Sequence, residues 1–267
     1  MTETEKLKES LFRKTKTGWE GLEENVKNSI FKFCDEYIAF LNKSKTEREI
    51  IKSVKSLVEE KGFRNINEYN KLKAGDKVYY INRDKSMYLA IIGRNNIENG
   101  INIIGAHADS PRLDLKPNPL YEESGLAYLK THYYGGVKKY QWTTIPLSMH
   151  GVIVKANGEK QEICIGEDEK DPIFTITDLL PHLASEQMER KLKEGIKGEE
   201  LNLLIGSIPY NGENIADAVK LNILKILNDK YGITEIDFVS SEIELVPAFN
   251  SRTMGLDKSM VARIWSR

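Results

Sequence analysis

The sequence predicts an α/β protein in which a layer of helices and strands is followed by a second domain rich in short strands. Helical periodicity dominates residues 20–62, alternating strand patterns joined by turn residues follow in residues 77–104, and short strands fill residues 126–165. The chain has 267 residues, which is long enough for a sizeable core and for two domains.

Two helices are expected first. Across residues 20–42, apolar side chains recur at steps of three and four, which is the pattern of an amphipathic helix. Residues 46–49, Thr-Glu-Arg-Glu, have the form of a capping box, in which the side chains of Thr46 and Glu49 each accept a hydrogen bond from the other's backbone N–H. A second helix is therefore expected to begin there and to end at Gly62.

A β-hairpin and a buried strand are expected next. Residues 77–81 and 87–92 alternate between apolar and polar side chains, and polar turn residues separate them, which indicates a hairpin. A turn at residues 95–100 then leads into the isoleucine-rich run 101–104. This run predicts a short buried strand that ends at Gly105.

The chain is then expected to leave regular structure before it enters the second domain. Pro111, Pro117 and Pro119 exclude a continuous helix or central strand and predict an ordered loop. Short strands and two helices follow, and a last strand is expected to return the chain to the first domain. The strands are expected at 126–134, 142–146, 150–155, 162–165 and 236–246, and the helices at about 176–194 and 215–231.

The clearest candidates for chemistry are His107 and Asp109, directly after the expected strand. In an extended chain, residues two apart point to the same side at a spacing of about 7 Å. The pair suits a metal-ligating histidine fixed by an outer carboxylate, or a general base held by an orienting acid. His132 and His150 are interpreted as structural, with His150 expected at a turn before Gly151.

Three segments together resemble the aspartyl aminopeptidase and aminopeptidase I family of dinuclear zinc exopeptidases. They are AHADSPRLDLKPNP at residues 106–119, DLLPHLA at 178–184 and ELVPAFNSRTMGLDKSM at 244–260. Their order and spacing also resemble the family, and the resemblance extends from about residue 11 to residue 260. It implies a zinc-dependent aminopeptidase that hydrolyses N-terminal residues from peptides.

The resemblance also implies a domain organisation. Residues 1–110 would form the N-terminal part of a catalytic α/β domain, residues 111–235 an inserted β-rich dimerisation domain, and residues 236–267 a strand that returns to the catalytic domain. The fold expected from the resemblance is therefore an incomplete aminopeptidase-type catalytic α/β domain with an inserted dimerisation domain. A homodimer or higher homo-oligomer is the expected state.

The same resemblance assigns roles to three residues. His107 would bind one of two zinc ions, and Asp109 would support that histidine as an outer partner in catalysis. His182 matches a position where the dimerisation domain lends a histidine to the active site of the partner subunit. The family's other metal ligands and its general-base glutamate follow the segment that matches residues 257–260.

The chain ends at Arg267, before those ligands, so an incomplete zinc site and an inactive, truncated chain are expected. Residues 263–267 could be encoded by AGG ATA TGG TCA AGA, which one nucleotide later reads Gly-Tyr-Gly-Gln followed by Asp or Glu, the family's next motif. Our hypothesis is a frameshifted gene, which resequencing would test. The alternatives are a naturally short paralogue or a non-catalytic dimerisation and assembly module.

The composition gives no sign of a nucleic-acid or membrane partner. The 39 basic residues nearly balance the 40 acidic residues, so no global field favours such surfaces. No apolar run approaches the roughly 18 to 20 residues of a membrane span, and the N-terminus lacks the apolar stretch of a signal peptide. Cytoplasmic residence is the expectation. The acidic run of residues 167–171 is interpreted as a solvated loop.

Overall fold

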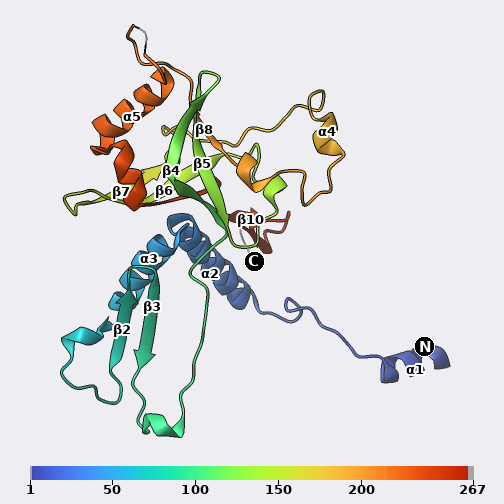
Figure 1. Ribbon diagram of the computed structural model, residues 1–267. Coiled ribbons are helices and arrows are strands. Elements are labelled where there is room, and N and C mark those ends of the chain that lie inside the picture. Colours follow the sequence, from blue (N-terminus) through green and yellow to red (C-terminus); the bar gives the residue numbers. More distant parts are fainter. Residues whose placement is uncertain (1, 214, 264–267) are drawn as a thin grey trace.

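The computed structural model describes residues 2–213 and 215–263, so residues 264–267, which the frameshift hypothesis needs, lie outside the described part. Figure 1 shows two units that meet near α2 and α3: a strongly curled sheet with α5 beside it, and a smaller unit built on β2 and β3. The expectation of a mixed α/β protein with a second, β-rich unit is confirmed.

The first unit begins with helices whose ends follow the sequence signals. α1 (Glu3–Leu11) stands away from the other elements and buries no residue (Figure 1). α2 (Glu24–Lys43) buries only Leu41, near its C-terminal end, whereas α3 (Glu47–Glu60) buries four residues. The capping box of Thr46 and Glu49 is present at the start of α3. Gly62 follows the helix with a φ of 82°, which a glycine adopts without strain.

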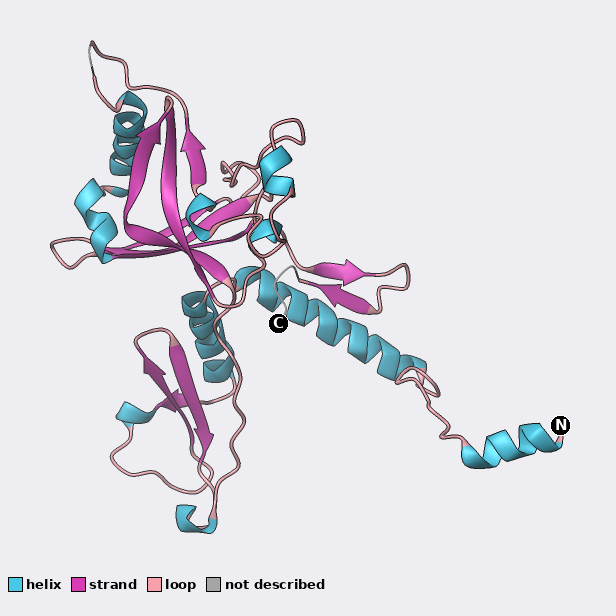
Figure 2. Cartoon of the chain, turned by 45° about the vertical axis from the view of Figure 1, so that its right-hand side comes forward, coloured by secondary structure: helices cyan, strands magenta, loops and turns pink. Residues whose placement is uncertain are grey.

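The expected hairpin is also present. β2 (Lys77–Asn82) pairs antiparallel with β3 (Ser86–Ile91), and β1 (Arg64–Asn65) adds a short parallel strand, giving the order β1-β2-β3. Figure 2 shows this small sheet beside α3. The short 3₁₀ helices of this unit are η1 (Ile66–Glu68) and η2 (Ile97–Asn99).

The predicted buried strand at residues 101–104 is wrong. The segment is irregular, and the side chains of Ile101, Ile103 and Ile104 are 63%, 78% and 98% exposed. No strand pairs with the segment in the described part of the chain, so its backbone groups find no ladder partners. The apolar pattern alone therefore does not form a strand here.

The second unit contains a six-stranded sheet and the main hydrophobic core. The strand order is β7-β6-β9-β4-β5-β8, and all the paired neighbours are antiparallel. Leu113, Trp142, Leu147 and Leu245 are among the fully buried side chains of this core, against which α5 packs. The bounds are β4 (Arg112–Glu123), β5 (Leu126–Tyr134), β6 (Leu147–Val154), β7 (Lys160–Ile165), β8 (Leu203–Gly206), β9 (Ser241–Pro247) and α5 (Ala218–Tyr231).

The expected proline loop is instead the long strand β4. Pro117 and Pro119 lie where the pairing of β4 with β5 shifts register, between Leu115 and Leu120. On its other side β4 pairs with β9 only at Leu113 and Asp114. The prolines therefore occupy a bulge in which the ladder does not need their missing N–H groups.

Three further expected elements differ from the structure. The strand expected at 142–146 is a bent, irregular segment after the 3₁₀ helix η3 (Lys139–Gln141). The helix expected at 176–194 is reduced to α4 (Ser185–Met188), because Pro181 interrupts it and its apolar residues, including Leu180 and Leu183, find no core. The remaining elements are η4 (Gly198–Glu200), β10 (Arg252–Met254) and β11 (Met260–Ala262).

The strand expected at 236–246 begins only at Ser241, and it joins the six-stranded sheet instead of returning to the first unit. Residues Glu235–Ser240 form the 3₁₀ helix η5, because Thr234 and Asp237 make a capping box. β9 then lies between β6 and β4 in the six-stranded sheet. The chain returns to α2 only after β9, where the backbone N–H of Ser251 donates to Asn42 Oδ1 at 2.6 Å.

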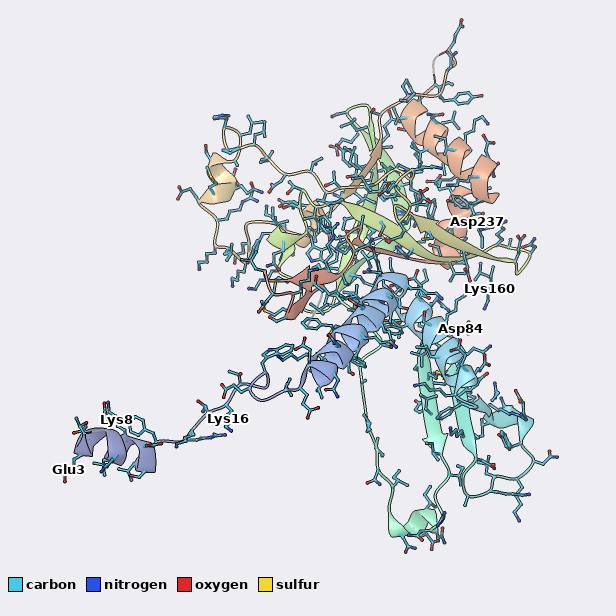
Figure 3. All side chains as sticks on the ribbon, turned by 180° about the vertical axis from the view of Figure 1, so that it is seen from behind. Glu3, Lys8, Lys16, Asp84, Lys160 and Asp237 are labelled. Carbon is cyan, nitrogen blue, oxygen red and sulfur yellow. The ribbon has the colours of Figure 1, made fainter. Side chains whose placement is uncertain are left out.

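Charged contacts join the two units. Lys45 Nζ, just before α3, lies 2.7 Å from the Glu167 carboxylate and donates to the carbonyl oxygen of Pro247. Figure 3 shows Asp84, in the β2–β3 turn, beside Lys160 of β7, and their charged atoms are 3.7 Å apart. Every helix in the described residues is too short or too polar to cross a bilayer.

Candidate metal-binding site

His107 and Asp109 form a hydrogen-bonded pair, as their spacing suggested. His107 Nδ1 lies 2.7 Å from Asp109 Oδ1. An ionised carboxylate only accepts hydrogen bonds, so in the neutral imidazole Nδ1 carries the proton and Nε2 keeps its lone pair. The His107 side chain is 69% exposed, whereas the Asp109 side chain is 19% exposed. The pair thus presents one nitrogen ligand atom toward solvent.

Tyr134, at the end of β5, holds the other oxygen of Asp109. Its hydroxyl donates to Asp109 Oδ2 at 3.3 Å. The negative charge of Asp109, helped by partial burial, raises the pKa of Tyr134 above its ordinary value. Tyr134 is the Cα partner of Arg112 in the β4–β5 ladder, and the Arg112 guanidinium lies 3.9 Å from the Tyr134 ring centroid. This is a close cation–π contact.

Arg112 is itself held by carboxylates from other elements. Its Nη1 donates to Glu47 Oε1 of α3 at 2.8 Å, and its Nε donates to Asp114 Oδ1 at 2.8 Å. Burial alone would lower the pKa of Arg112, but the charges of Glu244, Asp114 and Glu47 raise it. Arg112 is therefore a buried cation that connects α3, β4 and the Tyr134 ring.

Glu244 of β9 is the least well solvated carboxyl group among the neighbours of Arg112. Its Oε2 lies 3.5 Å from Arg112 Nε but accepts no hydrogen bond from the described residues. Burial raises the pKa of Glu244 to about 7, against the opposing effect of Arg112. Glu244 is thus a carboxyl group whose charge the fold disfavours.

His182 lies in a different place from the pair. It occupies an exposed turn at residues 181–183, directly before α4. The segment around it is held by Asp178, whose Oδ1 accepts hydrogen bonds from the backbone N–H of Leu179 and from the side chain of Gln187. The structure therefore brings together His107 and Asp109 and leaves His182 on a separate surface turn.

The prediction that His150 stands at a turn is wrong. His150 lies within β6, is 3% exposed, and is held between two carboxylates. Its Nδ1 is 2.7 Å from Glu49 Oε1, and its Nε2 is 2.9 Å from Glu167 Oε1. The next residue, Gly151, meets the carbonyl oxygen of Glu242 so closely that a Cβ atom would not fit.

The titration of this group follows from its contacts. Burial disfavours the charge on His150, but hydrogen bonds with Cys164, Glu167 and Glu49 raise its pKa to about 11. Burial likewise opposes ionisation of Glu167, but hydrogen bonds from His150, Lys45 and Ser148 lower its pKa to about 2. Glu167 is therefore part of a buried ion cluster. The interpretation of the acidic run 167–171 as a solvated loop is wrong for this residue.

The sequence of the chain matches a known family over most of its length. The profile described as "Aminopeptidase I zinc metalloprotease (M18)" matches residues 40–264.

The chain belongs to this M18 family.

A probable M18 family aminopeptidase 1 from Clostridium acetobutylicum is 49% identical over 255 residues, which cover 94% of this chain and 55% of the relative. The crystal structure of an M18 family aminopeptidase from Thermotoga maritima aligns with a TM-score of 0.87 and 46% identity, over 94% of this chain and 54% of that one. Aminopeptidase I from Clostridium acetobutylicum aligns with a TM-score of 0.85 and 47% identity, over 94% and 56%. The chain spans about half the length of the curated relatives it matches.

The description of the M18 family includes zinc. The described residues of this chain fit only part of a zinc site. A zinc site in a protein needs three or four ligands in close proximity. The described residues contain no group of three histidine, cysteine, aspartate or glutamate side chains placed to hold a metal. His107 with Asp109 fits one ligand and its outer carboxylate, which is the usual arrangement for a metal-bound histidine.

Proposed function

We propose that the whole protein is a zinc-dependent aminopeptidase that hydrolyses N-terminal residues from peptides. The observation that carries this proposal is the His107–Asp109 pair, with its 2.7 Å contact, in a chain that is 49% identical to a probable M18 family aminopeptidase. Zinc, when bound, would polarise the scissile carbonyl and activate water.

In this proposal each residue of the pair has a separate task. His107 binds zinc through Nε2, and Asp109 keeps the Nδ1 proton in place and makes the ring a better electron donor. The other ligands of a site with two zinc ions come from protein that corresponds to the unmatched part of the relatives. The described residues of this chain offer no further group of ligands.

We also propose that the β-rich unit serves assembly. In this proposal residues 111–235 act as the inserted dimerisation domain, between the catalytic segments 1–110 and 236–267, although β9 of the last segment pairs with β6 and β4 in the sheet of the inserted domain. His182 enters the partner's active site. The exposure of His182 in its turn supports this role. A structure described as the S. cerevisiae mApe1 dodecamer shares the fold, with a TM-score of 0.61 at 17% identity. A homodimer or a higher homo-oligomer is the proposed state, and cytoplasmic residence, which cell fractionation would test, is proposed with it.

The test is a chimera that joins residues 1–263 to the unmatched C-terminal part of the Clostridium acetobutylicum relative. Zinc per chain is measured by elemental analysis, and turnover is measured with aminoacyl chromogenic substrates. We expect bound zinc and hydrolysis that chelation abolishes. A folded, zinc-free chimera that leaves every substrate intact would refute the proposal.

A second candidate function is a non-catalytic assembly module. It is favoured by one observation: the described residues hold a six-stranded sheet with its own hydrophobic core but no group of three side chains placed to hold a metal. The 267-residue chain alone separates the two functions. Substoichiometric zinc, no hydrolysis and a stable dimer would favour the module, whereas zinc-dependent hydrolysis by the chain would favour the enzyme.

A further inference from the structure

We propose that Tyr134 is a positioning residue for His107: its hydroxyl fixes the Asp109 carboxylate so that His107 keeps its proton on Nδ1 and presents Nε2. This inference deepens the proposed function and rests on it for the use that is made of Nε2. The geometry itself is independent of any metal, because it concerns only contacts among this chain's own side chains.

The Asp109 carboxylate is shared between two partners. Oδ1 lies 2.7 Å from His107 Nδ1, and Oδ2 accepts the Tyr134 hydroxyl at 3.3 Å. A carboxylate held at both oxygens cannot rotate about its χ2 torsion without losing one of these hydrogen bonds. The Asp109 side chain is 19% exposed, whereas the His107 side chain is 69% exposed, so the carboxylate is the less solvated member of the pair.

Tyr134 is itself held in place by Arg112. Arg112 faces it across the β4–β5 ladder, with the guanidinium 3.9 Å from the ring centroid. The side chain of Arg112 is only 7% exposed, and it binds Glu47 and Asp114 at 2.8 Å each. The ring is therefore held against a buried cation whose position is set by both neighbours.

The side chains that hold His107 come from both units. Glu47 is the first residue of α3, Arg112 and Tyr134 belong to the six-stranded sheet, and His107 belongs to the irregular segment between them. That segment has no strand partner in the described residues that would fix His107 through its backbone. Successive side-chain contacts position His107 instead. They run from Glu47 through Arg112 and Tyr134 to Asp109.

The experiment compares Tyr134→Phe with Tyr133→Phe in the 267-residue chain. Tyr133 is the adjacent residue of β5, and its ring stacks on His132 instead of facing Asp109. Each variant loses one hydroxyl and keeps its ring. Imidazole ¹⁵N chemical shifts, recorded with ¹⁵N-histidine labelling, report the tautomer of neutral His107, and a His107→Gln variant assigns its signals among the four histidines.

We expect Tyr134→Phe to lower the ratio of Nδ1–H to Nε2–H tautomer of His107 by roughly threefold or more, as the loss of a hydrogen bond to a charged group implies. Tyr133→Phe should leave the ratio as in the unsubstituted chain. An unchanged ratio in a folded Tyr134→Phe variant, or an equal change in both variants, would overturn the inference.

A second measurement separates this inference from the proposed function. In the chimera, Tyr134→Phe should weaken zinc binding at the His107 site by roughly tenfold, the lower end of the effect of losing an outer partner of a metal ligand. If the tautomer changes but the chimera neither binds zinc nor hydrolyses peptides, the positioning role stands and the proposed function fails. If the chimera binds zinc and hydrolyses peptides but Tyr134→Phe leaves the tautomer ratio unchanged, the proposed function stands and the positioning role fails.

Discussion

His150 Nδ1 of β6 and Glu49 Oε1 of α3 lie 2.7 Å apart, although the two residues are separated by 101 positions in the chain. The other oxygen of Glu49 accepts the backbone N–H groups of Lys45 and Thr46 at the start of α3. One carboxylate thus caps a helix of the first unit and binds a buried cation of the second. This contact is one of several charged contacts that join the two units.

We expect His150→Ala to destabilise the chain by roughly 3–5 kcal/mol, because it leaves the Glu49 carboxylate without its buried cation and leaves Glu167 with Lys45 alone. Urea unfolding of the chain measures the change. His132→Ala is the matched control: His132 is exposed on β5, and its replacement should cost no more than about 0.5 kcal/mol. Equal losses in the two variants would mean that the cluster contributes nothing specific.

The same cluster predicts how stability depends on pH. The pKa of Glu167 falls from 4.5 to about 2 in the folded chain, so its contribution is complete above pH 4.5 and is lost as the pH falls toward 2. The pKa of His150 rises from 6.5 to about 11, so its contribution is complete below pH 6.5 and is lost as the pH rises toward 11. The stability difference between the unsubstituted chain and His150→Ala should therefore be largest between these limits and smaller at about pH 9. A difference that grows toward pH 9 would contradict this prediction.

Glu244 should act in the opposite direction to Glu167. Its pKa rises from 4.5 to about 7 on folding, so the protonated form stabilises the fold below pH 4.5, and this contribution is lost as the pH rises to 7. Glu244→Gln keeps the shape of the protonated form at every pH. We expect the variant to gain stability relative to the unsubstituted chain between about pH 5 and pH 8, measured by urea unfolding at both values. No gain would mean that Arg112 needs the Glu244 charge.

The role of His182 is testable in the chimera. His182→Ala should lower turnover by roughly a hundredfold or more if this residue touches substrate across the subunit interface, and it should leave zinc content unchanged. Size-exclusion chromatography of the variant controls for a loss of the dimer. Unchanged turnover in an intact oligomer would exclude His182 from the partner's active site.

Local patterns predicted the parts of the fold that local forces determine. The capping box of Thr46 and Glu49 and the β2–β3 hairpin depend on residues a few positions apart, and both appear as expected. The burial of His150 depends on α3, about a hundred residues earlier, and no pattern around Gly151 carries that information. The loop predicted from Pro117 and Pro119 is wrong for a related reason. The bulge that accommodates these prolines depends on the pairing of β4 with β5.

The candidate site divides in the same way. His107 and Asp109 are two residues apart, so their contact is local and their spacing predicts it. The contact of Tyr134 with Arg112 could not be predicted by extending the register of the β4–β5 hairpin residue by residue. Extending the register from the pair Leu120 and Leu129 would place Arg112 opposite Val137, and only the bulge brings it opposite Tyr134.

The most direct test of His107 as a zinc ligand is the zinc content and hydrolysis of the chimera with His107→Ala, beside His132→Ala as the control. We expect His107→Ala to lose about one zinc ion per chain and nearly all hydrolysis, because a zinc site needs its three or four ligands together. His132→Ala should match the unsubstituted chimera. Full zinc occupancy and turnover in His107→Ala would contradict the assignment of His107 as a metal ligand.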